Sequence, residues 1–270
     1  MNCIGFIGFG LIGGSIAKAL KNKMPNLKII AYTRNPEDTN LAMKEGVVDV
    51  ALTSIDRTFS EAEIIFICTP VKIMLNIMNE LKPYLSSDQI VTDVGSVKSY
   101  VHQCAKEVGI SDIYVGGHPM AGSEKSGYMA AYSALFFGKN YIITKNAELA
   151  NDPVYAMKVK KLCNLVDLLG CNIATMDPKE HDYAVAGISH VPHLVSAALV
   201  QTVIDMDTEN KAVVIHTANR NIVTYKKLYE FEKRLGDRLF YRCHQGYLVN
   251  LDYVERVQED SLILKEKVTI

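Results

Sequence analysis

The stretch Cys3-Ile-Gly-Phe-Ile-Gly-Phe-Gly-Leu-Ile-Gly13 decides how the first part of this chain folds. A short apolar run leads into glycines spaced as Gly8-x-Gly10-x-x-Gly13, and a helical pattern follows over residues 11–22. In such a strand-turn-helix unit, the first glycine makes the turn, the second lets the backbone approach a pyrophosphate, and the third lets the helix pack on the strand. The pattern therefore predicts a dinucleotide-binding loop, and its alternative is a tight turn without a ligand.

Apolar runs of strand length recur along the chain, with helical patterns between them. The runs cover residues 28–33, 63–68, 89–93, 113–116 and 140–144. This alternation indicates parallel βαβ units. We therefore predict an α/β fold class, with a Rossmann-type, doubly wound parallel sheet over residues 1–150. A truncated helical segment, with helices over 154–169 and 184–206, would occupy residues 151–211, and a small, mostly β module would occupy residues 212–270.

The end of the second predicted strand bears on which nicotinamide cofactor would bind. An acidic residue at this point normally holds the ribose 2′-hydroxyl of NAD, whereas a nearby arginine accommodates the 2′-phosphate of NADP. This chain has Thr33 and Arg34 there. The two residues favour NADP over NAD. The alternative is that Arg34 is only a solvated charge, in which case the preference disappears.

Two polar loops follow later strands of the predicted sheet. Asp93-Val-Gly-Ser-Val-Lys98 ends one strand, and Gly116-Gly-His-Pro-Met-Ala-Gly-Ser-Glu-Lys-Ser-Gly127 ends the next. Loops at the carboxyl ends of parallel strands are where such sheets bind their ligands. His118, which lies between glycine and proline and precedes Ser123 and Glu124, therefore marks a candidate site.

Together these motifs resemble those of prephenate dehydrogenases, which carry D-x-G-S-x-K and H-P-M-A-G-S-E-x-S-G after an N-terminal G-x-G-x-x-G. A fourth match is Ile188-Ser-His-Val-Pro-His193, which follows Asp177-Pro-Lys-Glu-His-Asp182 and corresponds to the family's substrate-facing helix. The resemblance covers residues 1–210. It implies an enzyme of tyrosine biosynthesis that catalyses the NAD(P)-dependent oxidative decarboxylation of prephenate or arogenate.

The resemblance also implies roles for individual side chains. His118 matches the catalytic histidine, and a neutral imidazole, with a reference pKa of about 6.5, suits a base that takes the substrate's hydroxyl proton. Ser96 matches the serine that orients this histidine and the hydroxyl. Four further residues match positions that face the substrate: Ser123, Glu124, Ser189 and His193. Taken without the family, each histidine would be an ordinary surface or structural residue.

The sequence departs from the family pattern after Asn210. In the family, the helical domain continues for several helices, forms most of a dimer interface and supplies a carboxylate-binding arginine in a motif resembling G-G-F-x-D-x-T-R. This chain lacks that motif, and its nearest arginine, Arg220, lies in a predicted β-hairpin. We therefore expect impaired turnover, and a homodimer is an expectation of the resemblance alone.

The tail resembles the later part of a LytTR-type DNA-binding domain, the mostly β output module of many bacterial response regulators. Leu239-Phe-Tyr-Arg-Cys-His-Gln-Gly-Tyr-Leu-Val-Asn-Leu-Asp-Tyr-Val254 matches a pattern like F-x-R-x-H-R-x-Y-L-V-N-x-x-x-I. We expect a hairpin over 212–217 and 221–225, a helix over 226–236, and strands over 240–242, 247–257 and 262–270. By this resemblance, DNA would meet Arg242, His244 and Gln245. The alternatives are a broken module that contributes only strands, or a non-functional fusion of two incomplete modules.

Composition limits the remaining function classes. Hydrophobic residues make up 49% of the 270 residues and charged residues 22%, as in ordinary globular proteins. Net charge is −1, and residues 213–270 carry 10 Lys and Arg against 8 Asp and Glu, a small excess for a DNA-binding module. Six scattered cysteines, no basic leader and no apolar run of membrane-spanning length predict a cytoplasmic protein with reduced thiols. No metal site is predicted.

Overall fold

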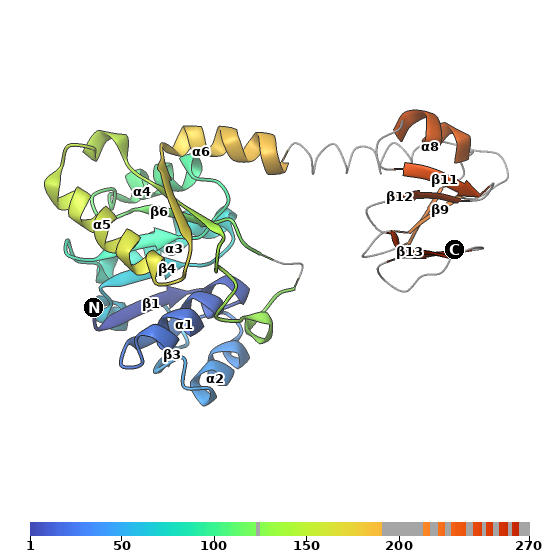
Figure 1. The fold of residues 1–270 in the computed structure, drawn as a ribbon. Helices are drawn as coiled ribbons and strands as arrows, with labels where there is room; N and C mark the ends of the chain where they lie inside the picture. Colours follow the sequence, from blue (N-terminus) through green and yellow to red (C-terminus); the bar gives the residue numbers. More distant parts are fainter. Residues whose placement is uncertain are drawn as a thin grey trace. The chain divides into compact units, whose positions relative to one another are not determined.

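The computed structural model describes residues 1–122 and 125–190, together with 213–216, 221–224, 228–235, 240–244, 247–250, 254–258 and 261–264. It divides into two units, Met1–Gly187 and Ile188–Ile270, and each is described by itself (Figure 1). The domain boundaries expected at residues 150 and 211 stay predictions.

A five-stranded parallel sheet forms the centre of the first unit. Its strands are β1 (Cys3–Ile7), β2 (Lys28–Tyr32), β3 (Val50–Leu52), β4 (Ile64–Ile67) and β5 (Ile90–Asp93), in the order β3-β2-β1-β4-β5. The strands β1, β4 and β5 are buried along their whole length, as expected of apolar strands covered on both faces. This topology confirms the predicted fold class.

Helices cover both faces of this sheet (Figure 1). They are α1 (Leu11–Lys23), α2 (Pro36–Lys44), α3 (Met74–Leu81) and α4 (Ser99–Val108). One buried cluster joins α1 to the sheet through side chains such as Ile16 and Phe66, and a second joins α3 and α4 to the sheet through Met78 and Val101. Short 3₁₀ helices lie in the connections: η1 (Arg57–Glu61), η2 (Val71–Ile73), η3 (Lys82–Tyr84), η4 (Tyr128–Ala130) and η5 (Ala147–Leu149).

The order of the strands reverses at the centre of the sheet. From β1 the chain moves to β2 and β3, and it then returns to β4 on the other side of β1. The connections that leave β1 and β4 therefore part in opposite directions. Doubly wound sheets bind their ligands at such a reversal, beyond the carboxyl ends of the strands.

A three-stranded sheet extends the first unit beyond β5. It contains β6 (Gly116–Pro119), β7 (Asn140–Thr144) and β8 (Asn172–Met176), with β6 antiparallel and β8 parallel to β7. Just before β6, backbone hydrogen bonds of 2.9 Å, from Val91 to Ile113 and from Val115 to Val91, join the chain to β5. The strand expected over 113–116 was placed too early, because only Tyr114 forms a bridge there and β6 begins at Gly116.

Two helices of the predicted helical segment belong to the first unit: α5 (Pro153–Asp167) and α6 (Pro178–Val185). Each starts with proline after an aspartate N-cap, and Asp177 forms a capping box with Glu180. Helix α6 continues into a π-helical turn, Ala186–His190. The helix expected from residue 184 therefore starts earlier, and residues 191–206 lie outside the described part. No helix in the described part of the chain is long and apolar enough to cross a membrane.

The second unit contains three two-stranded antiparallel sheets and a helix in its described residues. The pairs are β9 (Val213–His216) with β10 (Asn221–Thr224), β11 (Phe240–His244) with β12 (Tyr247–Asn250), and β13 (Val254–Gln258) with β14 (Ser261–Leu264). Helix α8 (Leu228–Leu235) buries Phe231 and contacts β11 and β12. The predicted hairpin and helix are confirmed, whereas the single strand expected over 247–257 is wrong, because β12 and β13 pair with different strands.

Candidate active site

The loop between β1 and α1 contains two glycines that the fold itself requires. Gly8 has a φ of +90°, and a Cβ there would lie 2.6 Å from the carbonyl oxygen of Cys68 at the end of β4. A Cβ on Gly13 would lie 2.7 Å from the carbonyl oxygen of Gly8. These contacts let α1 pack closely on the sheet, which is the role expected of the first and third glycines of the motif.

Gly10 is different, because nothing in the described protein requires a glycine at this position. A Cβ on Gly10 would meet no atom closer than the backbone nitrogen of Gly127, at 3.9 Å. Gly10 is also the N-cap of α1, and no side chain caps the helix there. Uncapped amides at a helix N-terminus favour anions. The open space over Gly10 therefore fits a phosphate group drawn close to the backbone.

A second observation at this edge also points to a ligand. Thr69, which follows β4, has a buried hydroxyl oxygen with no hydrogen-bond partner among the described residues. Its methyl group would lie 3.1 Å from a Cβ on Gly8, so the side chain lies against the glycine loop. Buried hydroxyls normally find a partner, and a bound ligand at the loop would supply one.

The end of β2 adjoins the same loop, because the Gly8 amide donates to the Tyr32 carbonyl at 2.7 Å. Thr33 and Arg34 follow directly, with Thr33 partly buried and Arg34 exposed. Asp38 is an acidic residue a few positions after Arg34. Its carboxylate oxygens already accept hydrogen bonds from the Tyr128 amide and from the side chain of Asn35. Thr33 and Arg34 therefore directly follow a residue that is hydrogen-bonded to the glycine loop, and their predicted role in cofactor binding stays a prediction.

The segment after the third motif lies across α1 and α2 and holds the glycine loop. The ring of Tyr128 stacks on Phe9, with centroids 5.4 Å apart, and its hydroxyl donates to Glu45 at 2.6 Å. The Lys18 ammonium lies 4.3 Å from the centre of the Tyr128 ring, and the Tyr132 amide donates to Ser15 at 3.1 Å. The segment that follows the His118 motif therefore packs against the glycine loop and the helix after it.

Asp93 and Lys98, the first and last residues of the second motif, form a buried ion pair with no exposed side-chain surface. Lys98 also donates to the Gly117 carbonyl at 2.7 Å, and Tyr114 donates to Asp93 at 2.7 Å. Burial lowers the pKa of Lys98, although Asp93 acts in the opposite direction. These bonds connect the end of β5 to β6, so the pair positions the strand that carries His118.

His118 is buried on β6 and belongs to a chain of hydrogen bonds. Its Nδ1 lies 2.8 Å from Nε2 of His181, and Nδ1 of His181 lies 2.8 Å from the Asp182 carboxylate. The same carboxylate accepts the backbone amides of Lys98 at 2.7 Å and Ser99 at 2.8 Å, at the start of α4. Sequence reasoning missed His181 and Asp182 as site residues, because only the packing of α6 beside α4 brings them to His118.

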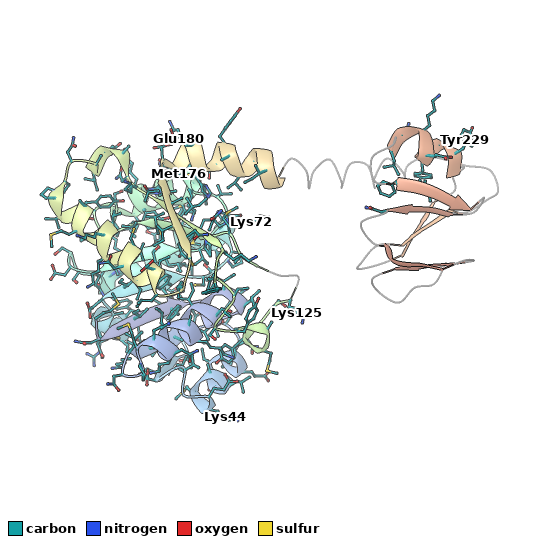
Figure 2. All side chains as sticks on the ribbon, viewed as in Figure 1. Lys44, Lys72, Lys125, Met176, Glu180 and Tyr229 are labelled. Atoms are coloured by element: carbon teal, nitrogen blue, oxygen red, sulfur yellow. The ribbon has the colours of Figure 1, made fainter. Side chains whose placement is uncertain are left out.

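Two lysine side chains lie near the carboxyl ends of the parallel strands. Figure 2 shows Lys72 and Lys125 on the side of the first unit where β1 ends. Lys72 lies in η2, the next element after β4, and Lys125 lies in the loop after β6. Both side chains are exposed, so cations stand at the edge where a phosphate or carboxylate would arrive.

Comparison with known proteins agrees with this geometry. A family model described as prephenate dehydrogenase, nucleotide-binding domain, matches residues 16–174. The prephenate dehydrogenase of Bacillus subtilis is 40% identical over 195 residues, which are 72% of this chain and 51% of that protein. This chain belongs to the prephenate dehydrogenase family.

A solved member of the prephenate dehydrogenase family has the same fold over most of this chain. It is the enzyme of Aquifex aeolicus, described as a complex with hydroxyphenyl propionate and NAD+. The TM-score is 0.71 at 34% identity, and the match covers 77% of this chain and 71% of that chain. An arogenate dehydrogenase from Synechocystis matches with a TM-score of 0.67, also at 34% identity, over 77% of this chain and 71% of that chain.

The relation to prephenate dehydrogenases is incomplete in length. The matched region spans about half of two of the curated relatives, 51% of the Bacillus protein and 53% of the Lactococcus lactis enzyme, which is 34% identical over 74% of this chain. A second family model, the LytTr DNA-binding domain, matches residues 195–270. The transcriptional regulatory protein LytR of Staphylococcus aureus is 36% identical over 59 residues, which are 22% of this chain and 24% of that protein. The predicted two-part resemblance is confirmed.

Several predicted site residues of this prephenate dehydrogenase family member lie outside the described part. Ser96 is described, and it lies exposed in the loop after β5, the strand that adjoins the start of β6. The backbone of Ser189 lies in the π-helical turn, and Arg242 and His244 lie on β11, but their side chains are outside the description. The remaining four predicted residues lie wholly outside it: Ser123, Glu124, His193 and Gln245.

Proposed function

We propose that this chain catalyses the oxidative decarboxylation of prephenate or arogenate with NAD or NADP. The observation that carries the proposal is the presence of two features in the first unit, after β1 and on β6. One is the glycine loop with its open position at Gly10, and the other is the buried His118, hydrogen-bonded by His181. The prephenate dehydrogenase family to which the chain belongs supports the choice of substrates.

The chemistry divides between the cofactor and the protein. A nicotinamide cofactor held at the glycine loop would supply the acceptor for the hydride of the ring carbon that bears the 4-hydroxyl group. His118 takes the proton of that hydroxyl at Nε2, so that the carbonyl can form. Loss of carbon dioxide then aromatises the ring, and the phenolate oxygen recovers the proton from His118. Hydride and carbon dioxide leave, and no net proton is released.

We further propose that NADP is preferred over NAD. Thr33 and Arg34 stand beside the glycine loop, where the 2′-phosphate of NADP would lie. Asp38, in the first turn of α2, already accepts hydrogen bonds from Asn35 and Tyr128. The Arg34 guanidinium therefore supplies the charge that distinguishes the two cofactors.

Substrate binding is where this chain differs from the family pattern. We propose that Ser96, Ser123, Glu124, Ser189 and His193 contact the substrate, and that Ser96 orients the substrate hydroxyl. The family's carboxylate-binding arginine motif is absent from the sequence. A charged hydrogen bond of this kind contributes about 1.5 to 3 kcal/mol, and its loss also loosens the geometry of hydride transfer. We therefore propose turnover at least ~100-fold below that of an intact family member.

The test is steady-state formation of reduced nicotinamide by the 270-residue chain with prephenate and with arogenate. The His118→Asn variant should lose all remaining turnover, because asparagine cannot take the proton. His102→Asn is the matched control, since His102 is a partly buried histidine that bonds Thr144 at 2.9 Å. It should keep the wild-type rate.

Two outcomes would contradict this proposal. Turnover that survives His118→Asn would show that another group takes the proton. Near-normal turnover by the unmodified chain would show that another cation, such as Arg220 or a residue of a partner chain, replaces the missing arginine.

A second candidate function rests on the LytTr DNA-binding model, which matches residues 195–270. We propose that the tail contacts duplex DNA through Arg242, His244 and Gln245. Its excess of only two positive charges, 10 against 8 over residues 213–270, predicts weak and salt-sensitive binding.

We also propose that the chain forms a homodimer and is located in the cytoplasm. The location is supported by free thiols at Cys3, Cys68, Cys104, Cys163 and Cys171.

A further inference from the structure

We propose that His181 and Asp182 are positioning residues that set the tautomer and orientation of His118. This inference rests on the proposed function, in which His118 is the base. The motifs of the sequence assign no role to either residue. The observation behind it is an unbroken series of hydrogen bonds from the start of α4, through Asp182 and His181, to His118 on β6.

The direction of each hydrogen bond follows from the carboxylate. An ionised carboxylate can only accept, and Asp182 already accepts the backbone amides of Lys98 and Ser99. Nδ1 of His181 must therefore donate to Asp182. In a neutral imidazole the other nitrogen is then an acceptor. Nε2 of His181 accepts, so Nδ1 of His118 donates, and the unprotonated nitrogen of His118 is Nε2.

This tautomer is the one that proton removal from a substrate needs. Nε2 of His118 keeps its lone pair, and the imidazolium that forms after proton transfer still donates from Nδ1 to His181. The opposite arrangement, with a proton on Nε2 of His181, would direct that proton at Nδ1 of His118. His118 would then have to be protonated at Nε2, where it could not take a proton from a hydroxyl group.

The charges around His181 favour the required neutral form. Its ring is fully buried, and burial lowers its pKa despite the opposing effect of Asp182. Lys98 adds to the lowering, Asp93 opposes it, and His118 faces its Nε2. Burial acts to raise the pKa of Asp182, but the amides of Lys98 and Ser99 and the His181 ring hold it below its usual value. His181 is therefore neutral, and Asp182 ionised, at neutral pH.

The anchoring of the series is local and rigid. Asp182 bonds two successive amides at the N-terminus of α4, which suits a negative charge. Helix α6, which carries both His181 and Asp182, starts at a capping box formed by Asp177 and Glu180. The two histidine rings meet edge to face with centroids 5.0 Å apart. The ring of His118 thus has one preferred orientation.

Three variants separate a positioning role from a merely structural one. In His181→Gln the amide oxygen can still accept from Nδ1 of His118, so kcat should stay within about tenfold of the wild type. His181→Leu removes the acceptor, and kcat should fall about 100-fold while KM changes little. Asp182→Asn presents an amide that can donate to His181, which reverses the bonds and should lower kcat at least as far.

Imidazole nitrogen spectroscopy gives a readout that does not depend on turnover. In the ¹⁵N NMR spectrum of the unmodified chain, His118, assigned by its absence in His118→Asn, should be the Nδ1-protonated tautomer at neutral pH. Asp182→Asn should convert it to the Nε2-protonated tautomer. An Nε2-protonated His118 in the unmodified chain, or equal kcat in His181→Gln and His181→Leu, would overturn the inference.

The two proposals can fail separately. An inactive chain whose His118 has the expected tautomer, and whose tautomer changes in Asp182→Asn, would refute the proposed reaction and support the positioning role. An active chain whose His118 is protonated at Nε2 would support the proposed reaction and refute the positioning role.

Discussion

Gly10 offers the sharpest test of the cofactor site, because the fold tolerates a side chain at this position whereas a bound pyrophosphate would not. The described protein leaves space at this position, with 3.9 Å from a Cβ to the nearest protein atom. Gly10→Ala should therefore cost only what an alanine N-cap costs relative to glycine, about 0.5 to 1 kcal/mol of unfolding free energy. A bound pyrophosphate would meet the same Cβ directly, and the larger Gly10→Val side chain would exclude it.

The expected loss of cofactor affinity in Gly10→Val is at least tenfold, or ~1.4 kcal/mol. Isothermal titration with NADP and with NAD measures this loss, and urea unfolding followed by circular dichroism measures stability. The matched control is Gly8→Ala. At a φ of +90° an alanine costs about 1 to 2 kcal/mol, and its Cβ would also lie 2.6 Å from a carbonyl oxygen, so this variant should lose stability first.

The refuting result is specific. A folded Gly10→Val protein that binds both cofactors as tightly as the unmodified chain would show that no phosphate approaches this backbone. Equal losses of stability in Gly10→Ala and Gly8→Ala would show instead that Gly10 serves the fold.

Three further predictions concern Arg34, the buried ion pair of Lys98, and the tail. Arg34→Ala should weaken NADP binding and leave NAD binding unchanged, and equal effects in titrations with both cofactors would remove the case for 2′-phosphate recognition. Lys98→Met leaves the Asp93 carboxylate buried without its cation and should cost about 3 to 5 kcal/mol in urea unfolding, whereas pairing it with Asp93→Asn should restore part of that loss. The full chain should bind duplex DNA weakly and lose that binding as salt rises, so sequence-specific binding in the nanomolar range at physiological salt would show that the tail is a working regulator.

Much of the fold could be predicted because its signals are local. The strands β1, β4 and β5 are short apolar runs buried on both faces, and their side chains show this without any knowledge of neighbours. Strand β8 could not be predicted in this way. Asn172, Ala174 and Thr175 are exposed, and it pairs with β7 alone among the described strands, so its sequence shows no alternation. Its pairing depends on a partner that lies about 30 residues earlier in the chain.

The candidate site also contains some residues that local sequence signals reveal and others that only tertiary packing brings together. The glycine loop is contiguous in sequence, and its spacing alone indicates why Gly8 and Gly13 must be glycine. His181 lies 63 residues from His118, and no spacing rule connects them. Lys98 was visible as the last residue of a motif, yet its contact with Asp93 and with the Gly117 carbonyl appears only when β5 and β6 lie side by side. Side chains that meet through tertiary packing therefore remained beyond sequence reasoning.

The location of these contacts indicates which parts of the proposed site remain, although the sequence departs from the family pattern after Asn210. The bonds that orient His118 come from β5, α4, β6 and α6, all of which lie within Met1–Gly187. The open position over Gly10 lies in the same unit. The hydrogen bonds that orient His118 and the open position over Gly10 therefore both lie within residues 1–187. The arginine motif expected from the family resemblance is absent from the sequence, so we expect a defect in turnover to appear in substrate binding and alignment. An added cation that anchors the carboxylate should then raise the rate without any change at His118, His181 or Asp182.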